Sequence, residues 1–490
     1  MTEEKYKLLC LACDSVLLGD DARIETIAIP WLHVMREHPI FLRQYEDLFT
    51  EKSYRKTLVD YFCLKLKRTI QWVKLIRHLF KLQNKFWIGE LKKLHTFDVI
   101  FVSHLLNASQ LSVEDDFYFN QVPQDLAKRG VKVLIVLINH TSAPIKVLNS
   151  GDNSLSIPRV VISKSLPARE EFRIWWQTKR QSNLFRQSAK IESDEFRKRV
   201  LKKAIIEATS PATKTSLRIA RAISELVRRT QVQTIITTYE GHAWERLVFA
   251  TARTVNQEIK SIGYQHAALF RLQHSAKRSL GATYDPDLIL TAGPVGLSQL
   301  KGSKSLTGIK LGILGSRRSL AISQQSFTAT CLVLPEGIAK ECQILFSLSL
   351  QCAKSYPDIH FIWRLHPIIA LDDLVRCGLD LGNIPSNIEI SSQNFEADIA
   401  RCKWALYRGS TAIITAAANG VIPIYLTQAG ELSIDPLYEM GDSHLSIGYS
   451  HQFLDALEKS AVNPKLIKYC TQFYSPFDVS ILADQLTCSA

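Results

Sequence analysis

The sequence lacks any run of the roughly 18–20 uninterrupted apolar residues that a membrane-spanning helix needs. Its N-terminus, MTEEKYKLLCLACDSVLL, starts with mixed charge and offers no small-residue cleavage site, so we predict no signal peptide. These absences indicate a cytoplasmic protein, and peripheral contact with the inner face of the cytoplasmic membrane stays open.

The chain also lacks the glycine motifs of the common nucleotide-binding proteins. It contains neither GxGxxG nor GxxxxGK[ST], which excludes a dinucleotide dehydrogenase or a P-loop enzyme by motif. No recognisable nucleic-acid-binding signature is present, so we expect no nucleic-acid partner.

Cysteine gives no sign of a disulfide framework or a zinc site. The ten cysteines are scattered, several within apolar runs, which is typical of buried free thiols. Cys10 and Cys13 have the spacing of a redox pair but no second pair to complete a zinc site. The one Asp-x-Asp pair, Asp285-Pro286-Asp287, opens a predicted strand instead of closing one. We therefore expect no metal.

What the chain has in excess is positive charge, with a net charge of +13. Such an excess points to a polyanionic partner. Much of it lies in 55–93, which has eleven Lys and Arg against two acids, interleaved with apolar residues at helical spacing. That helix either lies on anionic lipid or packs on its own domain with its lysines in water.

At 490 residues the chain is too long for one core, and short β-branched runs alternate with longer helical patterns. We predict an α/β protein with two Rossmann-like parallel-sheet domains facing a central cleft, and with extra helices in the N-terminal half. The predicted strands lie at 7–11, 98–102, 131–138, 159–162, 234–238, 259–264, 287–290, 310–314, 330–334, 360–364, 387–390, 404–407 and 422–426.

The predicted domain division follows composition. Residues 1–292 form the first Rossmann-like domain, with a helical insertion at about 168–230 that is dense in Arg and Lys. The stretch 293–308 is rich in Gly, Ser and Lys and is predicted to be the linker. Residues 309–490 form the second Rossmann-like domain. Ligands of such sheets bind beyond the carboxyl ends of the strands, so polar residues just after strands are the site candidates.

Two strand exits stand out in the first half. After the strand at 234–238, Glu240 precedes a helix start; with a pKa raised by burial it would be a general base, and otherwise it complements the helix dipole. After the strand at 259–264, His266 either binds an acceptor or phosphate group or is a satisfied turn histidine. These two side chains are the candidate catalytic bases.

Two further exits lie in the second half. "RLHP" places Arg364 and His366 where they would hold a phosphate, with Pro367 fixing the backbone behind the histidine. The alternative is a surface ion pair and an ordinary proline turn. A second loop offers hydroxyl and backbone N–H groups at a helix start, either as an anion site or as a helix cap; it consists of Gly409, Ser410 and Thr411.

Taken together, the second half resembles the C-terminal domain of GT-B glycosyltransferases. RLHP, followed by the Gly-Ser-Thr loop, looks like the paired motifs of enzymes that use CMP-linked donors, such as sialyltransferases, Kdo transferases and teichoic-acid glycerophosphotransferases. The resemblance implies that 1–292 is the acceptor-side domain and 309–490 the nucleotide-sugar-binding domain, and that His366 and Ser410-Thr411 hold the nucleotide. Glu336, in Leu334-Pro335-Glu336-Gly337, and the acidic turn at Glu431 join these as donor-side candidates.

YEGHAWER and GYQH are similar to stretches in bacterial surface-carbohydrate biosynthesis proteins, such as those of capsule and lipopolysaccharide. The resemblance implies transfer of a sugar, with His366 also acting at the leaving group, from a nucleotide donor to a glycan or its lipid-linked precursor. It covers roughly 230–435, and the acidic base motif of the sialyltransferase subgroup is missing from the first domain. The alternatives are a UDP- or GDP-sugar transferase, a sugar-nucleotide epimerase or hydrolase, and a non-catalytic glycan-binding assembly protein.

Overall fold

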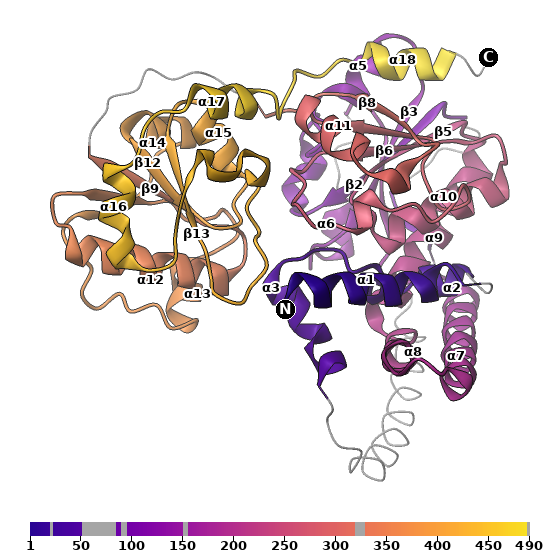
Figure 1. Cartoon of the computed structure of the whole chain (residues 1–490). Coiled ribbons are helices and arrows are strands. Elements are labelled where there is room, and N and C mark those ends of the chain that lie inside the picture. Colours follow the sequence, from indigo (N-terminus) through magenta and orange to yellow (C-terminus); the bar gives the residue numbers. More distant parts are fainter. Residues whose placement is uncertain (20–22, 51–84, 90–95, 150–154, 319–328, 488–490) are drawn as a thin grey trace.

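The computed structural model describes residues 1–19, 23–50, 85–89, 96–149, 155–318 and 329–487. Two sheets dominate it, one of eight strands and one of six, each covered by helices (Figure 1). Strand pairing is parallel throughout both sheets except at the β1–β4 edge. The predicted α/β class with two Rossmann-like parallel-sheet domains is confirmed.

The first sheet has the strand order β1-β4-β3-β2-β5-β6-β7-β8. Its central strands are almost entirely buried, because helices cover both faces of a parallel sheet and each strand can then be apolar on both sides. The strands are β1(Trp87–Ile88), β2(Val99–Leu105), β3(Val133–Asn139), β4(Arg159–Ile162), β5(Thr234–Thr238), β6(Lys260–Gln265), β7(Leu288–Thr291) and β8(Lys310–Ile313).

The second sheet has the order β11-β10-β9-β12-β13-β14. Numbered in chain order, these strands read 3-2-1-4-5-6, the doubly wound order of a Rossmann domain. The strands are β9(Thr330–Leu334), β10(His360–Trp363), β11(Ile388–Ile390), β12(Trp404–Tyr407), β13(Ile422–Leu426) and β14(Leu445–Ile447). All predicted strands except 7–11 are confirmed, with ends that differ by a few residues; β1 and β14 were not predicted.

The strand predicted at 7–11 is wrong, because this segment belongs to the helix α1(Glu3–Leu17). The buried side chains Tyr6, Leu9, Cys13 and Val16 recur at intervals of three and four, which is the spacing of one helical face. A short apolar run does not separate helix from strand, and the periodicity over the whole segment does.

The predicted helical region near 168–230 is confirmed as three long helices, α7(Ala168–Ile191), α8(Glu195–Glu207) and α9(Pro211–Thr230). Helix α9 packs against α10(Ala243–Val255), the helix that follows β5. The other helices of the first domain are α2(Ile24–Ile27), α3(Pro39–Leu42), α5(Val122–Lys128), α6(Ile145–Asn149) and the 3-10 helices η1(Pro30–His33), η2(Arg43–Phe49), η3(Ala108–Ser112) and η4(Ser275–Lys277).

The linker predicted at 293–308 lies inside the first domain instead. Helix α11(Pro294–Lys301) and the 3-10 helix η5(Lys304–Leu306) connect β7 to β8, and β8 pairs with β7 in the first sheet. Gly and Ser in this stretch allow a short helix to pack closely; a Cβ at Gly293 would lie 2.4 Å from the carbonyl oxygen of Phe473. The chain therefore crosses to the second sheet after β8 and not before it.

The chain end returns to the first domain. In the second domain lie α12(Ala339–Ser355), α13(Leu371–Arg376), α14(Phe395–Arg401), α15(Ala412–Ala418), η6(Tyr438–Ser443), η7(Ser450–Gln452), α16(Phe453–Glu458) and α17(Pro464–Thr471). Helix α18(Ser480–Thr487) then packs into the apolar core of the first domain through Val479 and Leu482 (Figure 1). Along the way Gly315, with φ +102°, lets the two crossing segments touch, since a Cβ there would be 2.2 Å from the Pro476 carbonyl oxygen.

Most of the basic segment 55–93 lies outside the described residues. Within it, Trp87 and Ile88 form β1, which pairs with β4, so this part is a strand and not the predicted helix. No helix in the described part of the chain combines the length and apolar character that spanning a bilayer requires.

Replacing Leu482 by Ala tests the docking of the chain end. Leu482 is fully buried against the first domain, so Leu482→Ala should lower the free energy of unfolding of that domain by about 2–5 kcal/mol. Urea titration measures the loss. Leu454→Ala, at an exposed leucine of α16, is the control and should change stability little; equal small effects would contradict the docked arrangement.

Candidate active site between the two domains

The turn after β5 carries the first group of site residues. Gly241 has φ +80°, a conformation that favours glycine, and a Cβ there would lie 2.2 Å from the carbonyl oxygen of Ser275. The Ser275 hydroxyl donates to the carbonyl of Glu240 at 2.9 Å. The turn therefore has one backbone path, and it fixes Glu240 and His242 at the carboxyl end of the sheet.

Glu240 is buried and ionised. Its Oε2 accepts a hydrogen bond from Nη2 of Arg36 at 2.8 Å and lies 3.5 Å from Nε2 of His242. Burial alone would raise the pKa of Glu240, but the charges of Arg36 and His242 hold it well below its usual value. The alternative in which burial raises the pKa of this carboxyl is therefore wrong, because Arg36, 204 residues away in the sequence, contacts it.

The same pairing acts in the opposite direction on the neighbouring groups. Burial opposes the charge of His242, yet the carboxylates of Glu240 and Glu245 raise its pKa above the ordinary histidine value. Glu245 accepts from the backbone N–H groups of Glu240 and His242, and burial raises the pKa of Glu245 to about 7. A histidine with a carboxylate beside it is a unit suited to proton transfer near neutral pH.

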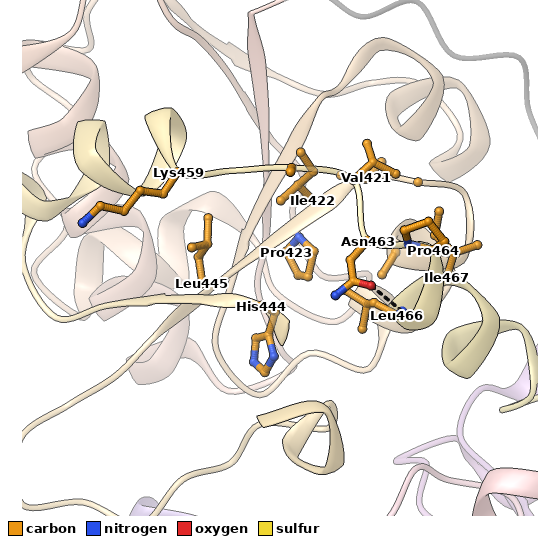
Figure 2. Close-up of a pocket in the computed structure, with 14 residues that line it drawn as sticks. Val421, Ile422, Pro423, His444, Leu445, Lys459, Asn463, Pro464, Leu466 and Ile467 are labelled. Atoms are coloured by element: carbon orange, nitrogen blue, oxygen red, sulfur yellow. Dashed lines mark hydrogen bonds between the residues drawn. The ribbon is translucent and has the colours of Figure 1, made fainter. Parts of the chain in front are cut away.

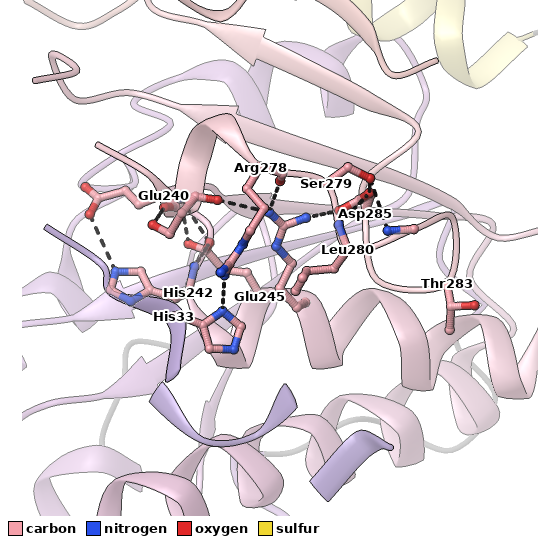
Figure 3. A network of polar contacts seen from close by, with 12 residues as sticks. His33, Glu240, His242, Glu245, Arg278, Ser279, Leu280, Thr283 and Asp285 are labelled. Atoms are coloured by element: carbon pink, nitrogen blue, oxygen red, sulfur yellow. Dashed lines mark hydrogen bonds and ion pairs between the residues drawn. The ribbon is translucent and has the colours of Figure 1, made fainter. Parts of the chain in front are cut away.

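A buried network supports this turn from behind (Figure 3). The fully buried side chain of Arg246 pairs with Asp285 and donates to the carbonyls of Ser275 and Arg278. It thereby fixes the connection between β6 and β7, which in turn holds the turn at Gly241.

The next link of this network leads to the N-terminal segment. Arg278 pairs with Asp14 and donates to Nδ1 of His33 at 2.9 Å, while Nε2 of His33 donates to the carbonyl of Ile27 at 2.8 Å. Burial and the charge of Arg278 keep the pKa of His33 well below its usual value, so this ring stays neutral.

The extended segment after His33 bridges the two domains. Arg36 contacts Glu240 of the first domain, and two residues later Nε2 of His38 lies 3.0 Å from Oε1 of Glu336 in the second. The segment begins at Val34, a buried β-branched residue with φ +46°, a strained conformation that surrounding contacts must impose. The carboxyl ends of the two sheets are thus joined through side chains of one short segment.

Imidazoles and aromatic rings gather beside Glu240. Nδ1 of His104, at the end of β2, lies 2.8 Å from Nε2 of the exposed His140, and its Nε2 lies 3.0 Å from Oγ1 of Thr238. Burial and the nearby histidines lower the pKa of His104 to about 3. A hydrogen-bonded chain therefore runs from a buried hydroxyl to the surface through a neutral ring.

His266 belongs to the same wall. Its ring is 4.6 Å from that of Tyr118, which also contacts His104 at 5.4 Å, and Nδ1 of His266 is buried with no partner among the described residues. Burial lowers the pKa of His266, so it too is neutral. Glu240 and His266 lie close enough for the charge of Glu240 to act on the pKa of His266, as expected for residues that follow adjacent strands.

The second domain brings several of its candidates together. A Cβ at Gly409 would lie 2.9 Å from Oε1 of Glu336, and one at Gly337 would lie 3.0 Å from Cε1 of His366. Burial lowers the pKa of His366 against the opposing effect of Glu336, and its Nδ1 accepts a long hydrogen bond from the N–H of Ile368 at 3.4 Å. His366 is therefore a neutral ring that carries its proton on Nε2, and no hydrogen bond from this N–H to another described residue is present.

Arg364 does not join this group. Its guanidinium donates to the buried Asp398 at 2.7 Å and to the carbonyl of Gln393 at 2.8 Å, and it lies over the ring of Phe395. An arginine that neutralises a buried carboxylate is committed to that partner. The ion-pair interpretation of Arg364 is the one that the geometry favours.

A different arginine reaches the hydroxyl loop. Arg318, an exposed residue beyond β8, donates to Oγ1 of Thr411 at 3.1 Å and to the hydroxyl of Tyr474 at 2.5 Å. Ser410 is buried beside it, ahead of α15. Arg318 therefore supplies the cation near Ser410-Thr411 that the sequence pattern assigned to Arg364.

Glu431 has a supporting contact. It pairs with Arg408, whose buried guanidinium also donates to Glu341 at 2.7 Å. His38, Glu336 and Glu341 each place one ligand atom within 4.8 Å of the others, the arrangement in which a cation could sit. In this structure Glu341 is paired with Arg408. Nδ1 of His38 accepts from the N–H of Ile40, so the proton of this ring is on Nε2, which donates to Glu336.

Sequence reasoning missed Arg36, His38, His104, His140 and Arg318. Two signals were present: His38-Pro39 is a second His-Pro dipeptide, and His104 and His140 follow or end predicted strands as Glu240 does. No local pattern marks Arg318, because its contacts are with residues far along the chain.

A separate cavity of about 350 Å³ lies at the start of β13 and β14, away from these residues (Figure 2). Its wall is largely aliphatic, with His444, Lys459 and Asn463 as its polar members. Because the strands begin here, this is the opposite edge of the second sheet from the interdomain residues.

No protein-family model matches the chain, and no curated protein matches it in sequence. Similar solved structures include the glycosyltransferase of kitacinnamycin, at 12% identity over 80% of this chain and 99% of that one, with a TM-score of 0.46. They also include the glycosyltransferase SnogD from Streptomyces nogalater, at 12% identity over 81% and 100%, with a TM-score of 0.44. A UDP-GlcNAc 2-epimerase from Neisseria meningitidis, solved with UDP-GlcNAc, matches at 13% identity over 80% and 100%, with a TM-score of 0.42.

The neutral ring of His104 makes stability depend on pH. Its pKa in the folded protein is about 3, far below the ordinary value. As the pH drops below about 6.5, His104 of the unfolded chain is therefore protonated while His104 of the folded protein stays neutral. The free energy of unfolding should fall with decreasing pH, by up to about 1.4 kcal/mol per pH unit from this group. His104→Gln should flatten the slope of stability against pH, measured by urea titration, whereas the exposed-site control His451→Gln should keep it; an unchanged slope in both would contradict the burial of a neutral His104.

Proposed function

We propose that this protein is a glycosyltransferase that moves a sugar from a nucleotide-activated donor to an acceptor hydroxyl. The observation that carries the proposal is the bridge at 36–38. It joins an ionised Glu240–His242 pair at the end of one parallel sheet to Glu336, Gly409 and their neighbours at the end of another. Transfer between two bound substrates needs a base on one side and an anion-stabilising group on the other, and the two sheet ends supply one each.

On the acceptor side, His242 takes the proton of the attacking hydroxyl. Its raised pKa makes it a stronger base than an ordinary imidazole, and Glu240, which stays ionised through Arg36, orients the ring and balances the charge it gains. This changes the role first assigned to Glu240, because a carboxylate with a strongly lowered pKa is a weak base. His266 remains the second candidate base because its ring is neutral and can take up a proton, but its lowered pKa makes it a weaker base than His242.

On the donor side, His366 donates from Nε2–H to the departing phosphate, and Arg318 with Ser410 and Thr411 supplies charge and hydroxyl groups. As the bond between the anomeric carbon and the phosphate oxygen breaks, negative charge grows on that oxygen. Donors that meet the developing charge lower the barrier more than ground-state binding does. A neutral His366 suits this task because it has one donor and no charge to lose.

The donor is proposed to be CMP-linked and the acceptor a surface glycan or its lipid-linked precursor. Support comes from the pairing of RLHP with the Gly-Ser-Thr loop, whose residues His366 and Gly409 lie against neighbouring residues Gly337 and Glu336. A UDP- or GDP-sugar would require the same phosphate contacts and differ in the base pocket, so binding must decide between them.

Nucleotide binding tests the donor side. A ligand present at a hundred times its Kd stabilises the fold that binds it by about 2.7 kcal/mol. At equal concentrations, CMP should therefore raise the melting temperature more than UDP, GDP or CDP, because it is proposed to have the lowest Kd. His366→Ala and Arg318→Ala should each reduce the shift, and Arg364→Lys should preserve it, since Arg364 serves Asp398. No shift with any nucleotide would contradict a nucleotide-sugar enzyme and favour a glycan-binding protein.

Turnover tests the acceptor side. His242→Gln should lower kcat by roughly 10²–10⁴-fold, the usual contribution of a positioned base. The wild-type kcat/KM should rise with pH through a pKa above the ordinary histidine value, and the variant should lose that rise. A variant that keeps the wild-type pH profile would assign the base elsewhere, and His266→Gln is the matched comparison. Donor consumption without acceptor would indicate an epimerase or hydrolase.

A further inference from the structure

Helices α7 and α8 form an antiparallel pair with an unusual outer surface. Helix α8 packs against the second half of the longer α7, and Ser182 of α7 donates to the carbonyl of Ile205 of α8 at 2.8 Å. In Figure 1 the pair projects from the first domain on the side away from its sheet. Four large apolar side chains on it are exposed: Phe172 (51%), Trp176 (51%), Ile191 (88%) and Ile206 (61%).

The exposed apolar residues share one stripe of α7 with basic residues. Arg169, Phe172, Trp176 and Arg180 follow each other at intervals of three and four, which puts them on one helical face. All four are exposed, and the guanidinium of Arg180 lies over the Trp176 ring at 5.6 Å. The stripe continues into a groove of about 460 Å³ along α7 that ends at Gln187.

The charge of the pair is positive and outward. Residues 168–207 contain eleven Lys and Arg against six Asp and Glu. The acids at the start of α7 are used internally: Glu171 accepts two hydrogen bonds from Arg218 of α9, at 2.7 and 2.8 Å, and Glu170 pairs with Arg173 at 2.9 Å. Arginine side chains and aromatic rings of the stripe are therefore exposed to solvent, and the two carboxylates at the start of α7 are engaged in ion pairs.

We propose that this stripe binds the surface of an anionic lipid bilayer. Tryptophan and phenylalanine are stable at the level of the lipid headgroups, where one part of the ring is in apolar surroundings, and arginine beside them contacts lipid phosphate. Each basic residue near an anionic leaflet adds to the attraction. A polyanion such as nucleic acid would neutralise the arginines but offer no apolar phase to Ile191 and Ile206.

This inference does not rest on the proposed function. It assigns to the described helices α7 and α8 a role that the sequence had suggested only for the segment 55–93. A bilayer at this surface would hold the first domain, and with it the Glu240–His242 turn, close to acceptors carried by lipids.

Co-sedimentation of the full chain with vesicles, without nucleotide, is the test. Vesicles of phosphatidylcholine with about a third phosphatidylglycerol should bind the protein, and pure phosphatidylcholine should bind it far less. Arg169→Glu with Arg180→Glu should weaken partitioning by roughly thirtyfold or more, and Phe172→Ala with Trp176→Ala by roughly tenfold. Salt should weaken the binding of the wild type.

Two controls match these changes on the other domain. Lys354→Glu reverses an exposed charge on α12, and Tyr449→Ala removes an exposed ring; both should bind as the wild type does. Circular dichroism and melting temperature establish that each variant is folded. A blue shift of fluorescence on vesicle binding that is lost in Trp176→Phe would place this ring at the lipid.

Heparin, a soluble polyanion, serves as a comparison ligand. Three results would overturn the proposal: the wild type does not bind anionic vesicles, the α7 variants bind vesicles as well as the wild type does, or the arginine substitutions abolish binding to heparin but leave binding to vesicles unchanged. The second would place the lipid contact elsewhere, and the third would identify a polyanion site. Nucleotide-induced melting shifts of the same variants separate this failure from failure of the transferase proposal.

Discussion

The buried pair of Arg246 and Asp285 is the interaction on which the interdomain site depends. Arg246 is inaccessible to water, and its guanidinium draws the connection between β6 and β7 against α10. Within that connection, Ser275 fixes the Gly241 turn, and Arg278, three residues later, fixes His33 ahead of the bridging segment. Removing one partner of such a pair leaves a buried charge uncompensated, at a cost of about 3–5 kcal/mol. Glu240 and Arg36 thus meet because two separate backbone segments are anchored to the same loop.

Strand positions could be predicted because they follow from local patterning. Parallel strands covered on both faces are largely apolar, and β3 and β9 each contain one polar residue only, at a strand end: Asn139 ends β3 and Thr330 begins β9. The failures arise where local composition does not decide. Residues 7–11 are as apolar as a strand but belong to a longer helical face, and 293–308 has linker composition because α11 packs closely against the returning chain end. Both depend on contacts with residues far along the sequence.

The candidate site divides in the same way. Glu240, His266 and His366 were found because each follows a strand, and the fold brings strand ends of one sheet together. Arg36 and His38 follow no strand, and Arg318 comes five residues after β8; all three reach the site through long-range contacts, at separations of 204, 298 and 93 residues from Glu240, Glu336 and Thr411. Arg364 shows the converse, since a strand-exit arginine looks the same in sequence whether its partner is a ligand or, as here, Asp398.

The division of charge among neighbouring groups gives the site its chemical direction. Glu240 precedes α10 and Glu245 lies in the first turn of that helix. Both are buried, yet the pKa of Glu240 is well below its usual value and that of Glu245 is raised to about 7. The difference comes from Arg36. Among the described residues, Arg36 is hydrogen-bonded to Glu240 and not to Glu245. Environments that separate the pKa values of adjacent groups are how a site assigns acid and base roles. Here they leave one fixed negative charge beside an imidazole of raised pKa, His242, and place the neutral imidazole of His366 in the other domain, so that a proton can be accepted on one side while negative charge is stabilised on the other.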